Sequence, residues 1–257
     1  MARVIVIANQ KGGVGKTTTA VNLSAYLGQH RKKTLLIDID PQGNATGGVG
    51  VDRNNLEHCV YDALINDVPL KALVINTDFK NLDLVPSSRQ LGGAEIELVD
   101  EVAREKRLAR QVDKIRDQYD FIIIDAPPTL GLLTLNALNA GDSLIVPLQC
   151  EYYALEGLSD ITNTFQLVKT HMNPNLELEG ILLTMYDGRT NLAQEVADEV
   201  REHFKKKVFK TVIPRTVRLS EAPSYGLPIL AYDPKSKGAE VYDALAGEVM
   251  KNAKKAK

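Results

Sequence analysis

The sequence predicts an α/β fold with a doubly wound, mostly parallel sheet and flanking helices. Short, fully apolar runs, typical of strands buried on both faces, alternate along the chain with segments of helical periodicity. The first apolar run passes directly into a glycine-rich turn and a helix, and two later runs end in aspartate. This order favours βαβ units with right-handed crossovers, a design that places ligands at the carboxyl edge of the sheet.

Length and composition are those of one soluble globular domain. The chain has 257 residues, of which 44% are hydrophobic and 25% charged, and its formal net charge is −2. This charge excludes a uniformly basic nucleic-acid binder and leaves room for a local basic patch. We expect one domain over residues 1–250, followed by a disordered polar tail of lysine and alanine over 251–257.

The cysteines and apolar runs predict a cytoplasmic protein. Cys59 and Cys150 are the only cysteines and lie far apart, as expected of buried free thiols in a reducing cytosol. The N-terminal apolar run is too short for a signal peptide, and no stretch approaches the roughly 18 apolar residues of a membrane span.

The expected elements follow from the position of each apolar run. Strands are predicted from residue 4 and over 33–38, 81–86, 119–125, 143–149, 178–185 and 208–213. Helices are predicted over 16–29, 59–65, from 151 to about 171, and from 238 to the end of the domain. The alternating charges of 95–118 indicate a solvated helix face.

Residues 4–19 predict a strand, a phosphate-binding loop and a helix start. Glycines in this loop allow positive φ and close approach of the backbone, so that successive N–H groups can face phosphate oxygens. Lys16 places a cation on the phosphates, Thr17 offers a hydroxyl to Mg²⁺, and the helix adds the positive end of its dipole. The strict motif needs glycine where this chain has Gln10; the alternative is an ordinary turn between strand and helix. The candidate nucleotide contacts here are Lys11, Gly12, Gly13, Val14, Gly15, Lys16, Thr17 and Thr18.

Two further strands bring carboxylates to the same edge. Asp38 and Asp40 are spaced by two and therefore point the same way on an extended chain. We expect Asp40 to orient the water that attacks a γ-phosphate and Asp38 to support the metal or the loop; the alternative is that they cap the next helix. Asp125 follows a strand buried on both faces and predicts a metal-supporting acid, acting through a metal-bound water or through Thr17, with a structural hydrogen bond as the alternative.

Two later loops supply the remaining candidates. The loop after residue 213 also lies at the carboxyl edge and is positioned to hold the nucleotide base. Arg189 and Arg218 stand in loops of exposed character, where each alone reads as a surface arginine or salt-bridge partner. Lys205–Lys207 form a charge run that fits either a basic patch or a solvated helix end.

The motif with a second lysine, Lys11, resembles the deviant Walker A motif of the ParA/MinD family of ATPases. The segment 38–44, Asp-x-Asp-Pro-Gln-Gly-Asn, resembles the family's switch I, and Ala-Pro-Pro after Asp125 resembles the start of switch II. The resemblance implies ATP and Mg²⁺ as cofactors, a nucleotide-sandwich homodimer, and a Lys11 that reaches the partner's ATP. It places the adenine at Pro214 and Thr216, where family members often have asparagine in place of the threonine.

Within that family the chain most resembles chromosomal ParA/Soj proteins, over nearly its whole length. Met-x-Asp-x-Arg and Val-Arg-Leu-Ser-Glu-Ala-Pro look like the segments whose arginines contact DNA, which assigns that role to Arg189 and Arg218. The resemblance implies an ATP-bound dimer that binds double-stranded DNA non-specifically on the nucleoid. A ParB-like partner bound at centromere-like sites of a chromosome or plasmid would stimulate hydrolysis and release the dimer.

Three rival functions share this fold. A MinD-like division-site regulator needs a C-terminal amphipathic membrane helix, and the last seven residues contain alanine as their only apolar type. An iron–sulfur carrier ATPase needs paired cysteines, which two isolated cysteines do not supply. A tyrosine-kinase relative usually carries a terminal tyrosine cluster, and this C-terminus is lysine and alanine.

Overall fold

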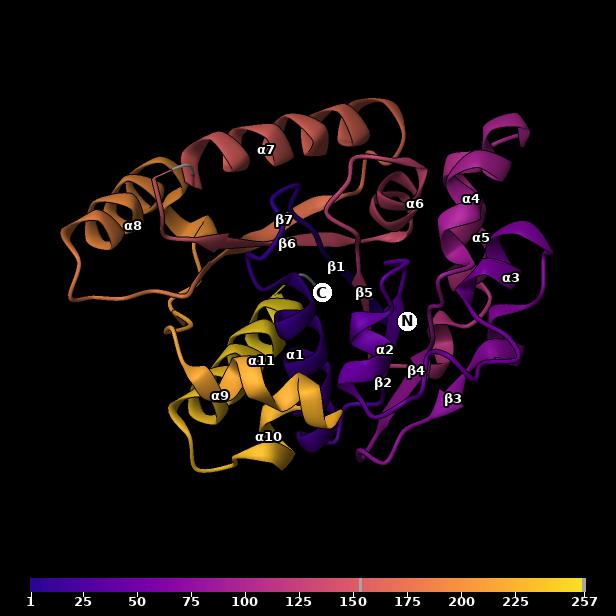
Figure 1. The fold of residues 1–257 in the computed structure, drawn as a ribbon. Coiled ribbons are helices and arrows are strands. Elements are labelled where there is room, and N and C mark those ends of the chain that lie inside the picture. The colour runs from indigo at the N-terminus through magenta and orange to yellow at the C-terminus, as the bar shows by residue number, and fades with distance from the viewer. Residues whose placement is uncertain (153, 256–257) are drawn as a thin grey trace.

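The computed structural model describes residues 1–152 and 154–255 and contains a seven-stranded sheet of order β3-β4-β2-β5-β1-β6-β7 (Figure 1). All neighbouring strands pair in parallel except β3, which runs antiparallel to β4 at one margin. The predicted fold class is therefore confirmed. The strands are β1 (Arg3–Ile7), β2 (Thr34–Asp38), β3 (Ile75–Asn76), β4 (Leu82–Val85), β5 (Phe121–Asp125), β6 (Ser143–Gln149) and β7 (Glu177–Thr184).

Helices cover both faces of the sheet, as a doubly wound fold requires. One face is covered by α3 to α8, and the other by α1, α2 and α9 to α11. The helices are α1 (Lys16–Gln29), α2 (Asn44–Gly48), α3 (Val60–Ile65), α4 (Leu91–Glu97), α5 (Arg107–Asp113), α6 (Leu132–Ala140), α7 (Ala154–His171), α8 (Asn191–Phe204), α9 (Val217–Glu221), α10 (Ile229–Tyr232) and α11 (Lys237–Lys255). In the described residues, no helix is long and apolar enough to cross a bilayer.

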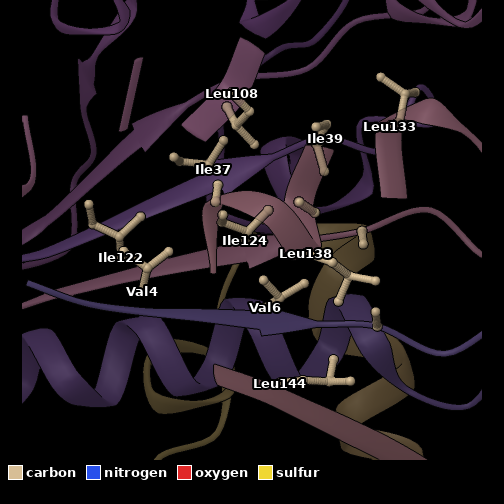
Figure 2. Close-up of a cluster of buried hydrophobic side chains, with 14 of the residues drawn as sticks. Val4, Val6, Ile37, Ile39, Leu108, Ile122, Ile124, Leu133, Leu138 and Leu144 are labelled. Carbon is tan, nitrogen blue, oxygen red and sulfur yellow. The ribbon is translucent and has the colours of Figure 1, made fainter. Parts of the chain in front are cut away.

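The core is divided between the two faces because successive side chains of a strand point to opposite sides. Val4 and Val6 of β1 join the cluster shown in Figure 2, together with Ile122 and Ile124 of β5. Ile5, Ile7 and Ile123 belong to the second cluster, which packs on α1 and α11. Burial on both faces explains why these strands read as unbroken apolar runs in the sequence.

The charged segment 95–118 is not one helix. It divides into α4, α5 and short 3₁₀ turns, and Ala103 between them has a left-handed φ of 52°. Leu98, Leu108 and Val112 from this segment are buried in the core. The prediction of one helix was therefore wrong, because the segment forms short helical pieces whose apolar residues are buried, although most of its charged side chains are exposed.

The segment 208–213 is not a regular strand. Its first residue, Val208, forms an isolated parallel bridge with Ile181 of β7, and a second bridge joins Tyr186 to Pro214 just beyond the ends of both segments. Backbone bonds from Phe209 N to Ile181 O (3.0 Å) and from Ile213 N to Leu183 O (2.9 Å) still align it along β7. The predicted strand is replaced by an irregular segment that nevertheless delivers the following loop to the carboxyl edge.

The predicted start of the polar tail differs from the structure, in which α11 continues through Lys255. Met250 and Ala253 pack against the core cluster beneath the sheet, and this contact extends the helix beyond residue 250. Residues 256 and 257 of the expected tail lie outside the described part of the chain.

Candidate active site

Three adjacent strand ends meet at the carboxyl edge. Asp38 of β2 and Ile7 of β1 are both paired in register with Asp125, the last residue of β5. The loop that follows β1 therefore begins beside two carboxylates that are far away in sequence. Parallel pairing alone produces this meeting of groups.

The glycine-rich loop is held open by contacts that the sequence motif did not reveal. Gly13 and Gly15 have φ of 75° and 88°, a left-handed conformation that favours glycine. The side-chain amide of Asn9 anchors the loop with both of its polar atoms. Its Nδ2 donates to Pro147 O (2.8 Å), and its Oδ1 accepts from Lys11 N (3.0 Å). Thr184 Oγ donates to Val14 O at 2.8 Å. A Cβ added at Gly13 would meet nothing within 4 Å, so this side of the loop is free to receive a ligand.

The two lysines of the loop differ in environment. Lys16 is buried, and its Nζ donates to Lys11 O at 3.1 Å. Burial lowers the pKa of Lys16, while the negative charges of Asp125 and Asp40 act in the opposite direction. Lys11 is about one-third exposed, with Nζ 3.9 Å from a carboxylate oxygen of Glu151. Lys16 thus faces the acids inside the site and Lys11 lies at its outer rim.

Asp125 is fully buried, and neither of its carboxylate oxygens has a hydrogen-bond partner among the described residues. Burial raises the pKa of Asp125 well above its ordinary range, and the charge of Asp38 raises it further. The Thr17 hydroxyl and the Lys16 charge lower it, without offsetting the burial. A buried carboxylate without partners is costly, and such a group is well suited to receive a cation or a hydrogen-bonded water.

Asp38 and Asp40 have different surroundings although both are buried. Asp38 accepts from Thr46 N (2.7 Å), Thr46 Oγ (2.8 Å) and Asp40 N (3.1 Å). Its pKa is raised to about 6, chiefly by burial, against the opposing hydrogen bonds from Thr46. Asp40 accepts from Gln42 N at 2.9 Å, while its own carbonyl accepts from Ser87 Oγ at 2.7 Å.

These contacts give the two acids different capacities. Asp38 is occupied in holding α2 and the turn 40–43 through these hydrogen bonds. Asp40 keeps one carboxylate oxygen without a hydrogen bond in the described residues. The sequence analysis did not predict a role for Thr46 or Ser87. Their hydrogen bonds to Asp38 and Asp40 form only when separate segments of the chain come together in the fold.

A cavity of about 270 Å³ adjoins the phosphate loop and is bordered by the loop after residue 213. Pro214 and Thr216, expected at the nucleotide base, both line it, and so do Gly15 and Thr18 of the phosphate loop. Met185 and Tyr242 also line it and were not predicted. Tyr242 lies in the apolar periodicity of α11, where its sequence pattern is that of a core residue.

Arg189, in the loop after β7, and Arg218, on the short helix α9 rather than in a loop, are both exposed and paired with acids. Arg189 contacts Asp187 at 2.6 Å, and its hydrogen bonds lower the pKa of Asp187 to about 2. Arg218 lies 3.1 Å from Glu221 and 3.4 Å from Asp233. Lys207 donates to Leu178 O, at the amino end of β7, so the lysine run lies at the opposite end of that strand from Arg189.

The parallel sheet and its glycine-rich loop define a P-loop nucleoside triphosphatase fold. Residues 2–178 match the family model described as AAA domain. The chain belongs to this family and, within it, to the ParA/Soj group of chromosome-partitioning proteins.

Relatives of known name support this assignment over nearly the full length. The chain is 58% identical over 252 residues to the sporulation initiation inhibitor protein Soj of Bacillus subtilis, covering 98% of this chain and 100% of that protein. It is 56% identical over 251 residues to the chromosome partitioning protein ParA of Myxococcus xanthus, covering 98% and 89%. A crystal structure of cobyrinic acid a,c-diamide synthase from Mycobacterium smegmatis with bound ADP and magnesium matches with a TM-score of 0.88 at 38% identity, covering 100% of this chain and 97% of that chain.

Proposed function

We propose that this protein is a Mg²⁺-dependent ATPase that partitions chromosomal or plasmid DNA. The observation that carries the proposal is the meeting at one sheet edge of an open glycine loop, the buried Lys16, and an Asp125 that has no hydrogen-bond partner within the described part of the chain. The magnesium and ADP bound by the similar Mycobacterium smegmatis protein support the choice of ligands. The partitioning role is supported by the names of the relatives that share more than half of the sequence.

The residues present fit a phosphate-bound Mg²⁺. Among the described residues, neither carboxylate oxygen of Asp125 has a hydrogen-bond partner, and the adjacent Thr17 supplies a hydroxyl oxygen, which is the donor type that Mg²⁺ prefers. Asp125 would act on the ion through its water or through Thr17. When bound, Mg²⁺ neutralises charge on the β- and γ-phosphates.

The hydrolytic chemistry rests on positioning and charge. The backbone N–H groups of the loop and Lys16 stabilise the phosphoryl oxygens as charge develops. Asp40, with a carboxylate oxygen not engaged by the backbone, places the attacking water. Lys11 at the rim acts in trans, reaching the ATP of a second copy in an ATP-dependent sandwich homodimer.

The DNA contacts fall to Arg189 and Arg218. Both guanidinium groups are exposed, and each would exchange an acidic neighbour for a phosphate. A dimer presents four such groups, and neutralising about four phosphates gives a salt slope of roughly −3.6. The dimer would bind DNA without sequence preference on the cytoplasmic nucleoid, until a ParB-like partner stimulates hydrolysis.

The C-terminal helix argues against a MinD-like membrane role. Leu245, Ala246 and Val249 of α11 are buried against the sheet, so its apolar face is already covered. The described remainder of α11 after Met250 has alanine as its apolar residue. This helix therefore lacks the free apolar face that interfacial binding needs.

The proposal is tested by measuring binding to an arbitrary DNA duplex with ATP, with ADP and without nucleotide. Asp40→Ala should hold the ATP-bound dimer, and its DNA affinity should depend on ATP. Arg189→Glu combined with Arg218→Glu should lower that affinity by at least about tenfold at moderate salt, because four attractive contacts become repulsive.

Arg201→Glu is the matched control, since Arg201 is also a partly exposed arginine paired with an acid of its own helix. It should leave DNA binding within about twofold. An ATP-bound dimer that binds no DNA would exclude the partitioning function, and binding to anionic vesicles would then favour the MinD-like alternative.

A further inference from the structure

The described surface contains an apolar cluster that the active site does not use. Ile96 is 78% exposed, Val99 50%, Val102 86% and Leu130 51%. Large apolar side chains so exposed at one place mark an interaction site more often than a free surface. We call Ile96, Val99, Val102 and Leu130 the α4 patch.

The four residues belong to one place on the molecule. Ile96 and Val99 are three residues apart on the helical stretch that begins with α4, so they share a side of it. Val102 follows at the turn, whose Arg104 donates to Val99 O. Leu130 joins from another segment, because its neighbour Gly131 lies against the carboxylate of Glu95. In Figure 1 this region lies at the outer margin, beside α5.

The charges around the patch select a partner. Residues 95–107 contain five acidic and three basic side chains, a formal charge of −2, and one of these bases, Arg107, is paired with Glu101. Asp100 and Glu105 have neither a hydrogen bond nor an ion pair among the described residues, while Arg104 is directed to a backbone carbonyl. The complementary ligand is a polypeptide segment that carries apolar side chains flanked by lysine or arginine.

The patch is connected to the active site by one carboxylate. Glu95 accepts from Leu132 N (2.8 Å) and Leu133 N (3.3 Å), and so caps the start of α6. The segment 126–131 between Asp125 and α6 is therefore held at its far end by α4. A ligand on the patch contacts the helix that fixes the end of this segment.

We propose that the α4 patch docks a cationic amphipathic segment of the protein that stimulates hydrolysis. This inference rests on the proposed function and adds to it a location and a chemistry for the partner. Occupancy by a second copy of the chain is the competing arrangement, and the test below separates the two.

The test uses Ile96→Lys with Val102→Lys, which places two positive charges where the cationic segment would pack. The full-length double variant is titrated with a short synthetic leucine–lysine amphipathic peptide and, separately, with the ParB-like protein of the same organism. We expect peptide affinity to fall about tenfold and the half-maximal concentration for stimulation to rise about tenfold. Unstimulated hydrolysis and ATP-dependent dimerisation should be unchanged, because both side chains are exposed.

Leu167→Lys is the matched control, as Leu167 is 60% exposed on α7, and it should behave as wild type. Unchanged peptide affinity and stimulation in the double variant would overturn the docking surface, and loss of dimerisation would assign the patch to a second copy. If the ParB-like protein fails to stimulate even wild type while the peptide still binds only to an intact patch, the partitioning function falls and the surface stands.

Discussion

The charged side chains at the two edges of the sheet differ in their hydrogen-bond partners. At the amino edge, Arg116 Nη2 contacts both oxygens of Asp142 at 2.7 and 2.8 Å, and Asp142 also accepts from Val4 N at 2.8 Å. At the carboxyl edge, Asp125 has no hydrogen-bond partner in the described residues, and burial lowers the pKa of Lys16. The carboxylate of the amino edge is therefore paired and stabilises the fold, although Arg116 Nε has no partner in the described residues, whereas the carboxylate of Asp125 is left short of partners that a ligand can supply.

Removing the lysine at the carboxyl edge should have the largest effect. Lys16→Met should lower kcat for ATP by about 100-fold or more, because a preorganised cation on the phosphates is lost. The thermal stability of the nucleotide-free protein should not fall, since the lost group is a buried ammonium whose pKa burial already lowers. Steady-state hydrolysis and thermal unfolding without nucleotide measure the two effects. If the kcat of Lys16→Met stayed within threefold of wild type, the proposed difference in role between the two edges would be wrong.

The same type of change at the amino edge should have the reverse outcome. Arg116→Met should lower the free energy of unfolding by about 2 kcal/mol, because Asp142 and Ala2 O lose a partly buried partner. The melting temperature should fall by about 4–8 °C with kcat unchanged. Arg201→Met removes an exposed pair within one helix and should cost less than about 0.5 kcal/mol. A large loss of kcat in Arg116→Met would show that the edges are not independent.

The pH dependence of the nucleotide-free protein should report the acids of the carboxyl edge. The pKa of Asp38 is raised to about 6 and that of Asp125 is also raised, so the folded chain retains protons that the unfolded chain releases near pH 4. Their contribution to stability is present below about pH 4 and is lost as pH rises through their raised pKa values, which for Asp38 is about 6.

Replacing Asp125 should reduce the loss of folding stability that accompanies rising pH. Asp125→Asn should stabilise the nucleotide-free protein by about 1–2 kcal/mol at pH 8 and have little effect at pH 4, because only the charged form is penalised by burial. Thermal unfolding of both proteins across this range, without Mg²⁺, gives the comparison. An equal change in stability at pH 8 and at pH 4 would contradict the interpretation that Asp125 is a buried charge without a partner. The variant should also lose stabilisation by ATP that depends on Mg²⁺.

The smallest effect is expected at the cavity proposed for the base, where Thr216 offers one of several hydroxyl groups. Thr216→Val keeps the shape and removes one hydrogen-bonding group, a change of about 0.5–1.5 kcal/mol. KM for ATP should rise by less than about tenfold with kcat unchanged, and the preference for ATP over GTP should weaken. A preference identical to that of wild type would leave base selection to Met185 and Tyr242, which line the same cavity.

The sequence predicted those parts of the site whose chemistry is local. Gly13 and Gly15 have the positive φ expected of the loop, and Asp38 and Asp125 stand where their strands end. Strand direction and glycine conformation are properties of a few consecutive residues, so one chain suffices to read them. The register that brings Asp38 beside Asp125 is likewise implied by two parallel buried strands.

Contacts between distant segments could not be predicted in this way. Asn9 and Thr184 shape the loop through bonds to Pro147 O and Val14 O, and neither residue carries a motif. The charged segment 95–118 kept a helical alternation of charge although Ala103 divides it. In each case tertiary packing, which leaves no local pattern, decided the outcome.

The irregular segment 208–213 closes one lateral margin of the sheet, and the two-residue antiparallel strand β3 closes the other. A long exposed strand is a template onto which another chain can add, the usual route to β-aggregates. In this protein, the segments at both margins are too short or too irregular for a strand of another chain to pair along them. Contacts between copies in a crowded solution therefore involve loops and helices. Such contacts can dissociate without unfolding the sheet of either molecule.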